Sequence, residues 1–148
     1  MSLFDTFDIS GSGLSAERLR MDTISNNIAN ANTTRTEDGD PYRRQMPVFE
    51  TRGDSFAAHL QNYMGQAGDS SDQQGVRVRE IVEDDAPFKE VYEPEHPDAN
   101  DEGYVEKPNV EIVKEMTDMI TATRAYEANA TAIDNAKNMA VNTLDIGR

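Results

Sequence analysis

Residues 109–144 carry a long helical stripe that limits what this chain can fold into. Its members alternate by four and three positions: Ile112, Met116, Met119, Thr123, Tyr126, Ala130, Ile133, Lys137, Ala140 and Leu144. This spacing is typical of a coiled-coil face, with Thr123 and Lys137 as polar interruptions. A helix of about 36 residues would be about 54 Å long. Because a globule of 148 residues does not need such a length, the helix must project or lie along a partner.

The ends of this C-terminal helix are also marked in the sequence. Pro108 precedes Asn109, whose side chain can cap the first turn. Glu111 and Glu115 lie in the early turns, where the helix dipole favours an acidic side chain. Gly147 favours an end to the helix. The pattern predicts a helical segment over residues 109–148.

A second, shorter pattern lies near the N-terminus, over residues 12–31. The apolar positions are Leu14, Met21, Ile24, Ile28 and Ala31. Leu14, Met21 and Ile28 are seven apart, and Glu17 is a polar exception. Gly11 and Gly13 weaken any helix upstream. The pattern predicts an N-terminal helical segment within residues 1–31, which covers only about half of the C-terminal helix.

The stretch TISNNIANANTTRT loads the end of that N-terminal helix with mediocre helix formers. Its asparagines are Asn26, Asn27, Asn30 and Asn32. Between packed helices, amide side chains can form hydrogen bonds across the interface and set its register. An ordinary polar helix face that ends in asparagine caps is the alternative. Under the first interpretation, Asn27→Ala or a charge at Ile133 blocks assembly and leaves the middle of the chain folded.

The middle of the chain, residues 32–108, is polar and rich in turns. Three strands are predicted: PYRRQMPVFET, with Pro47 at an edge or bulge, and VRVREIV and PFKEVYE, joined by residues 83–85. SFAAHLQNYM favours a short helix, whereas GQAGDSSDQQG and PEHPDANDEGY favour loops. The fold class is therefore α+β: two helical ends and a small, irregular, β-containing middle domain, of which residues 52–75 are variable or flexible.

Charge and composition exclude several functions. The net charge of −14 argues against nucleic acid and anionic membranes, which need clustered Lys and Arg. Hydrophobic residues make up 36% of the chain, below the usual 45–50%, so the core is thin and part of the apolar surface should find its partner on another chain. No window has 18 apolar residues, and the first residues do not form a cleavable signal peptide.

No catalytic, cofactor-binding or metal-binding pattern is present in the sequence. Cysteine is absent, and the two histidines, His59 and His96, have no partner at metal-ligand spacing. The loop at Asp98 begins like an EF-hand, but Asn109 stands where the bidentate Glu belongs. No nucleophile or phosphate-loop motif is found. We therefore expect no enzyme activity, no cofactor and no small-molecule substrate.

Four blocks of the chain together resemble the flagellar rod, hook and filament-junction axial proteins. SNNIANANTTRT is similar to their N-terminal motif through Ser25, Asn26, Asn27, Ala29, Asn30 and Thr33. The C-terminal helix is similar to theirs through Met119, Arg124, Tyr126, Asn129 and Ala136. PYRRQMPVF and HPDANDEGYVEKPNV narrow the resemblance to the proximal-rod family called FlgC. In residues 52–74 no block of that family is recognised.

The resemblance implies a structural subunit of the flagellar basal-body rod, the drive shaft that carries torque from motor to hook. It further implies export by the flagellar type III apparatus without a cleaved signal peptide, and assembly with itself and other rod proteins. In such proteins the terminal helices form a coiled-coil inner tube and become ordered on assembly. Other rod or hook-type subunits, a small type III secreted helical adaptor and a wall-cutting enzyme are the alternatives.

Periodicity and resemblance together predict a set of subunit-interface residues. They are Leu14, Met21, Ser25, Asn26, Asn27, Ile28, Ala29, Asn30, Thr33, Tyr42, Arg43, Gly103, Tyr104, Val105, Pro108, Asn109, Ile112, Met116, Met119, Arg124, Tyr126, Asn129, Ile133, Ala140 and Leu144.

Overall fold

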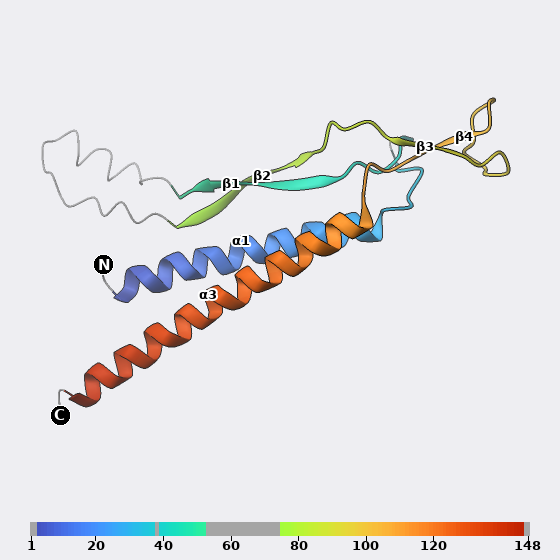
Figure 1. Cartoon of the computed structure of the whole chain (residues 1–148). Coiled ribbons are helices and arrows are strands. Elements are labelled where there is room, and N and C mark those ends of the chain that lie inside the picture. The colour runs from blue at the N-terminus through green and yellow to red at the C-terminus, as the bar shows by residue number, and fades with distance from the viewer. Residues whose placement is uncertain (1–2, 38, 53–74, 147–148) are drawn as a thin grey trace, which may run out of the picture.

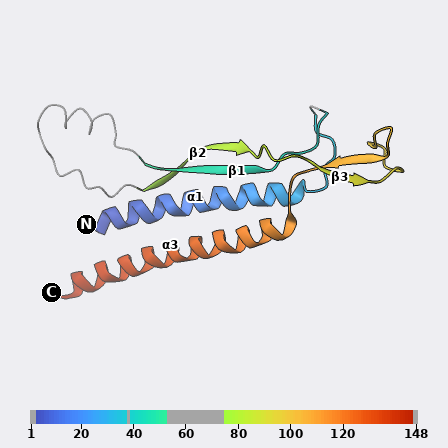
Figure 2. The same cartoon turned by 45° about the horizontal axis from the view of Figure 1, so that its top comes forward.

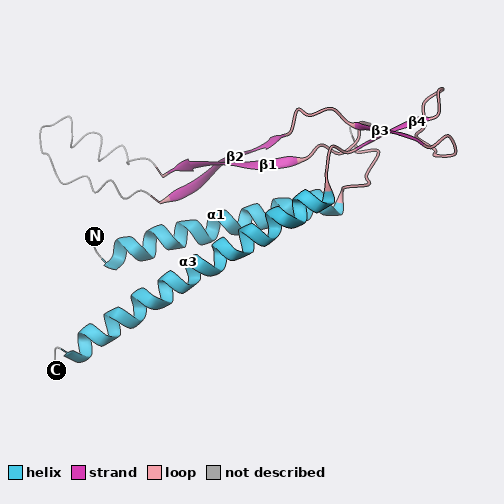
Figure 3. Ribbon diagram, in the orientation of Figure 1, coloured by secondary structure: helices cyan, strands magenta, loops and turns pink. Residues whose placement is uncertain are grey.

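The computed structural model describes residues 3–37, 39–52 and 75–146 (Figure 1). Its elements are α1 (Leu3–Ala29), β1 (Gln45–Thr51), β2 (Val76–Glu83), β3 (Lys89–Tyr92), β4 (Tyr104–Lys107) and α3 (Ile112–Ile146). Two long terminal helices therefore enclose a middle of short antiparallel strands (Figure 3), which confirms the predicted α+β class. Within the described residues, neither helix is apolar enough over a sufficient length to span a bilayer.

The two helices run antiparallel and lie side by side along much of their length (Figures 1 and 2). They are closest where α1 ends and α3 begins, and they diverge toward the two chain ends (Figures 1 and 2). The β1–β2 hairpin lies along α1, and the β3–β4 hairpin extends beyond the junction of the helices (Figure 1). One end of the molecule is thus helical and the other is a narrow β-tip.

Helix α1 begins nine residues earlier than the glycines led us to expect, at Leu3 instead of Ser12. A Cβ added at Gly13 would lie 3.0 Å from both side-chain amide atoms of Asn129 on α3, whereas a Cβ at Gly11 meets nothing within 4 Å. Gly13 therefore allows a close approach of the two helices. The packing of α1 against α3 and the hairpin offsets the low helix propensity of both glycines.

This difference predicts opposite results for two matched substitutions. Gly11→Ala should raise the free energy of unfolding by about 0.5–1 kcal/mol, because alanine is the better helix former. Gly13→Ala should leave the protein about 1–3 kcal/mol less stable than Gly11→Ala, because its methyl group presses on Asn129. Urea unfolding followed by circular dichroism measures both. Equal stabilities would contradict the close approach at Gly13.

The contact face of α3 is rotated by about one residue from the predicted stripe. Its most buried positions are Glu115, Ala122 and Ala136, and the half-buried Asn129 completes a spacing of seven. The predicted positions Met119, Tyr126, Ile133 and Ala140 are half-buried beside this line, and Ala130 is half-buried as well. The other predicted positions, Ile112, Met116, Thr123, Lys137 and Leu144, are exposed.

Helix α1 shows the same preference for small side chains at its contact face. Ser10, Gly13, Ala16, Thr23, Ile24 and Asn27 are buried, as is Ala31 just after the helix, whereas the predicted Leu14, Met21 and Ile28 are half-buried. Small residues let two backbones approach closely, so they take most of the centre of the interface, while most larger apolar side chains lie at its margin. The heptad spacing was predicted correctly. The predicted phase was wrong for α3 and for Leu14, Met21 and Ile28, whereas the predicted Ile24 and Ala31 are buried.

The start of α3 also differs from the prediction. Asn109 is not its N-cap, because the helix begins at Ile112 and the Asn109 side chain binds other segments. Glu115 is in the first turn, as predicted, yet its side chain is fully buried. The dipole is therefore only part of the reason for an acidic residue there.

The strands form two separate two-stranded sheets, β1–β2 and β3–β4. The register of β1–β2 shifts between Val48 and Phe49, which confirms an irregularity next to Pro47. Strand β4 was missed, because YVEK is short and follows a loop. Gly103 precedes it with φ of +85°, and a Cβ there would lie 2.9 Å from the Tyr92 ring. The helix predicted at residues 55–64 and nearly all of the loop at residues 65–75 lie outside the described residues.

Candidate functional site

A cluster of buried and half-buried polar side chains lies where α1 ends, β1 begins and α3 starts. We call it the junction cluster and define it as Asn27, Tyr42, Arg44, Asp84, Asn109 and Glu115. Asn27 comes from the end of α1, and Glu115 comes from the first turn of α3. The other members come from the segments flanking the β1–β2 hairpin and from the approach to α3. The cluster therefore connects every part of the chain that meets at this junction.

Asn27 is the link between α1, α3 and the start of β1. Its Oδ1 accepts hydrogen bonds from the Tyr42 hydroxyl and the Gln45 N–H, both at 2.9 Å. Its Nδ2 donates to the Gln45 carbonyl at 2.8 Å and to Glu115 Oε2 at 3.0 Å. Only 1% of the residue is exposed, so these partners replace water. The Asn27 side chain forms a hydrogen bond from one helix to the other, as predicted, and both helices belong to one chain.

Arg44 and Glu115 form a buried ion pair. The Arg44 Nε donates to Glu115 Oε1 at 2.6 Å, and 10% of the Arg44 side chain and none of the Glu115 side chain are exposed. Asp118 and Asp84 lie 3.5 Å and 3.6 Å from the other guanidinium nitrogens. A buried charge is costly unless its partner remains, so loss of either side chain leaves an uncompensated charge.

Asn109 holds the approach to α3 against both sides of the β1–β2 hairpin. Its Oδ1 accepts from the Arg44 N–H at 2.8 Å, and its Nδ2 donates to the carbonyls of Asp84 at 3.0 Å and Ala86 at 3.1 Å. Arg43, next to Arg44, lies over the Phe88 ring, 4.4 Å from its centroid, and its Nη1 donates to the Asp84 carbonyl at 3.3 Å. Of the two adjacent arginines, only Arg44 pairs with the buried Glu115.

Burial raises the pKa of the Tyr42 phenol above its ordinary value of 10.0, and the carboxylates of Glu115 and Glu83 raise it further. A group whose pKa is higher in the folded chain contributes stability below its unfolded pKa, and that stability is lost as pH rises through the folded value.

We therefore expect wild-type stability to fall above about pH 10, and to fall less steeply in Tyr42→Phe. Urea unfolding between about pH 8 and 11 tests this, with the exposed Tyr92→Phe as control. A Tyr42→Phe slope equal to that of wild type would contradict it.

The remaining asparagines of the motif end α1 instead of crossing to α3. Asn30 Nδ2 donates to the Asn26 carbonyl and to Asn26 Oδ1, both at 2.9 Å, and Thr33 Oγ1 lies 3.2 Å from Asn30 Oδ1. These side chains are exposed or half-buried. Both interpretations of the motif therefore hold, each for different residues: Asn27 joins the helices, and Asn26 and Asn30 form a polar helix end.

The structure brings together only some of the predicted interface residues. Asn27, Tyr42 and Asn109 meet in the junction cluster, and Val105 and Pro108 are buried near it. Ser25, Asn26, Ala29, Tyr104 and Arg124 are exposed. Sequence reasoning missed Arg44, Asp84 and the role of Glu115. The sequence does not indicate which of two adjacent arginines, or which residue of an acidic run, has its charged side chain buried. Whether the predicted residues contact other subunits stays a prediction.

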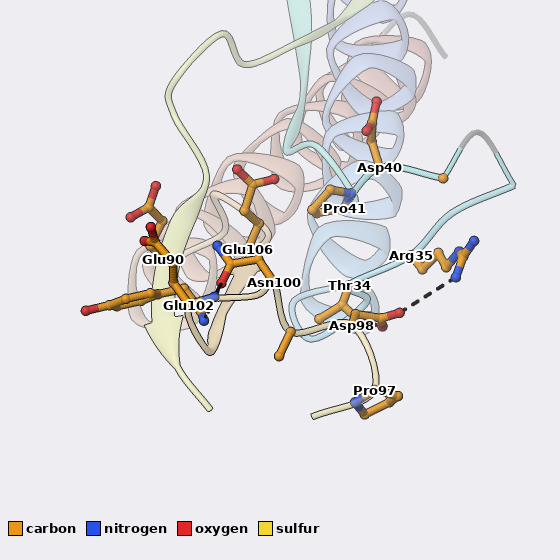
Figure 4. Close-up of a pocket in the computed structure, with 13 residues that line it drawn as sticks. Thr34, Arg35, Asp40, Pro41, Glu90, Pro97, Asp98, Asn100, Glu102 and Glu106 are labelled. Carbon is orange, nitrogen blue, oxygen red and sulfur yellow. Dashed lines mark hydrogen bonds and ion pairs between the residues drawn. The ribbon is translucent and has the colours of Figure 1, made fainter. Parts of the chain in front are cut away.

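An acidic hollow of about 760 Å³ lies between the segment after α1 and the β3–β4 tip (Figure 4). Asp98 binds Thr34 Oγ1 at 2.8 Å and lies 3.8 Å from the Arg35 guanidinium, whereas Glu90, Glu102 and Glu106 carry further acidic groups. The side chain of Asn100 accepts hydrogen bonds from the backbone of its own loop. Within the described residues, no three His, Cys, Asp or Glu side chains are grouped to hold a metal.

Two protein-family models match the ends of the chain. Residues 7–35 match the model described as "Flagella basal body rod protein". Residues 101–146 match "Flagellar basal body rod FlgEFG protein C-terminal". The matched ranges contain most of α1, all of α3 and β4, and the cluster residues Asn27, Asn109 and Glu115.

Whole-chain similarity extends these matches. The chain is 45% identical to the flagellar basal-body rod protein FlgC of Bacillus subtilis, over 100% of both proteins. It is 47% identical to the protein of that name in Borreliella burgdorferi, over 94% of this chain and 93% of that protein. Identity to the Salmonella typhimurium protein of that name is 38%, again over 100% of both. The likeness therefore includes the middle of the chain.

Proposed function

Since this chain belongs to the FlgC family of flagellar basal-body rod proteins, we propose that its function is mechanical: it assembles with other axial subunits into the shaft that carries torque from motor to hook. The observation that carries this proposal is the 45% identity over the full length of both chains. The chain is a structural subunit of the basal-body rod, and that is its location. Its relatives are rod proteins, which supports a role without catalysis.

The geometry of the junction cluster supports a mechanical role. A shaft subunit must pass load between its helices and its β-tip without local unfolding. The cluster joins α1, α3 and the β1–β2 hairpin through directed hydrogen bonds and an ion pair. Such bonds resist sliding between elements better than apolar contacts, which have no preferred direction. Torque applied to one element is therefore shared by the others.

Export by the flagellar type III apparatus and completion of the helix packing on assembly are further parts of the proposal. An acidic chain with a thin core and long exposed apolar helix faces suits a subunit that completes its packing only in an assembly. Head-to-tail contacts between such subunits do not close, so they build a helical shaft.

Quantitative mass spectrometry of purified hook–basal bodies, cytosol and culture medium tests the function. We expect this protein to be strongly enriched in the basal bodies relative to both other fractions. Abundance in the medium, with none in basal bodies, would instead identify a secreted adaptor and overturn the rod assignment.

A further inference from the structure

Among the residues that the structure describes, no helix lies beside the C-terminal end of α3. Asn27 contacts Glu115, and Gly13 faces Asn129. Moving one turn toward the start of α1 therefore moves the facing position on α3 one turn closer to its C-terminal end. On this register Leu3 faces the region of Met139, and about two turns of α3 extend past α1. Both ribbon views show this extension at the end marked C (Figures 1 and 2).

This free end exposes three aliphatic side chains among polar ones such as Asn138, Asn142 and Thr143. Met139 and Leu144 are 64% and 74% exposed, and Val141 is also exposed. Asp145 follows Leu144 directly, so the end presents aliphatic side chains and then a carboxylate. Burial of such side chains is worth roughly 1.5–3 kcal/mol each, which makes the end a strong candidate for a contact.

A matching hollow lies at the opposite end of the helix pair. Its volume is about 260 Å³, and Ala31, Val91, Pro108 and Val110 supply buried or half-buried apolar surface. Ile112 and Val113, at the start of α3, line it with exposed side chains. We call this the junction hollow. Its lining is more apolar than that of the acidic hollow described above. The two hollows are lined by alternate residues of β3 and β4, so they lie on opposite faces of these strands.

One lysine of the junction hollow, Lys89, carries a charge opposite to that of Asp145. Lys89 and Lys107 both line it, together with Asn32 and Glu111. Lys107 is paired with Glu93. The Lys89 ammonium donates to the Val110 carbonyl at 3.1 Å, and no described carboxylate lies within ion-pair distance of it. Lys89 therefore keeps donors and a positive charge for an incoming carboxylate.

We propose that the junction hollow receives the C-terminal end of an α3-type helix from the adjoining rod subunit. Aliphatic side chains enter the apolar part and the following carboxylate pairs with Lys89. This inference rests on the proposed function. The contact joins opposite ends of two similar subunits, so it is heterologous and does not close on itself. It names which surfaces carry the axial load from one subunit to the next.

Site-specific photocrosslinking in assembled rods tests this contact. A benzophenone amino acid replaces Ile112, hook–basal bodies are purified, and the linked peptides are identified by mass spectrometry. We expect them to come from the last turns of the C-terminal helix of an axial subunit. Links only to an N-terminal helix, to a β segment or to a non-axial protein would overturn the proposal, as would a protein incorporated into rods without any link.

A charge reversal provides the second readout. Lys89→Glu should lower the yield of the same cross-link about tenfold, which corresponds to about 1.4 kcal/mol. Lys114→Glu makes the same change on a neighbouring exposed residue that does not line the hollow, and should leave the yield unchanged. Equal yields for both variants would exclude the lysine contact. Absence of the wild-type protein from basal bodies would show a failure of the proposed function itself.

Discussion

Replacing Arg44 by methionine should lower the free energy of unfolding by about 3–5 kcal/mol, because Glu115 is then left charged and buried without its partner. Most domains are stable by only about 5–15 kcal/mol, so this variant should unfold at much lower urea concentration and fail to support motility. Urea titration with circular dichroism and a swarming assay measure the two effects.

Arg77→Met is the matched control for that experiment. Arg77 forms an ion pair with Glu50 through the same guanidinium nitrogen, but 61% of its side chain is exposed. Exposed ion pairs contribute about 0–1 kcal/mol, so Arg77→Met should stay close to wild type. If Arg44→Met were equally mild, the junction cluster would not hold the helices together.

The double variant Arg44→Met, Glu115→Met separates loss of the ion pair from loss of the packing. Removing both charges eliminates the unpaired carboxylate, and apolar replacements of buried ion pairs are often neutral or stabilising. We expect the double variant to recover most of the stability lost in Arg44→Met. A double variant less stable than the single one would show that the shape of the two side chains matters more than their charges.

Asn27→Ala is the second change with a large expected effect. It removes four hydrogen bonds and leaves the Gln45 N–H, the Gln45 carbonyl and Glu115 Oε2 without their Asn27 partner at a buried site, while Arg44 still binds Glu115 Oε1. Each unsatisfied buried group costs about 1–3 kcal/mol, although Tyr42 can turn to water. We expect a total loss of at least about 3 kcal/mol and loss of motility. Because Asn27 binds Gln45, we expect the disturbance to reach β1 as well as assembly.

Asn26→Ala tests the same motif one position earlier. Asn26 is exposed and makes one side-chain hydrogen bond, to Asn30, so its loss should change stability by no more than about 0.5 kcal/mol. The two variants should therefore differ clearly in unfolding midpoint and in swarming. Similar losses for both would mean that the motif acts through a surface shared with other subunits instead of through the junction cluster.

The sequence by itself determined the helical ends, the α+β class and the seven-residue spacing of the contact faces. Periodicity depends on local geometry, since residues seven apart return to nearly the same side of a helix. The acidic composition also argued against nucleic acid and anionic membranes as partners, which stays a prediction. The family was identifiable from four short blocks, because those blocks occur together and in one order.

Only the tertiary structure decided which of two neighbouring residues turns inward. Arg44 and not Arg43, Asn27 and not Asn26, and Glu115 and not Met116 are the buried members. The sequence pattern alone does not show which of two adjacent positions on a helix or an extended segment is buried. Their burial depends on how closely the helices approach, which Gly13 and the small residues of both contact faces set. Since that approach is a property of the packed pair, no single segment of the sequence contains it.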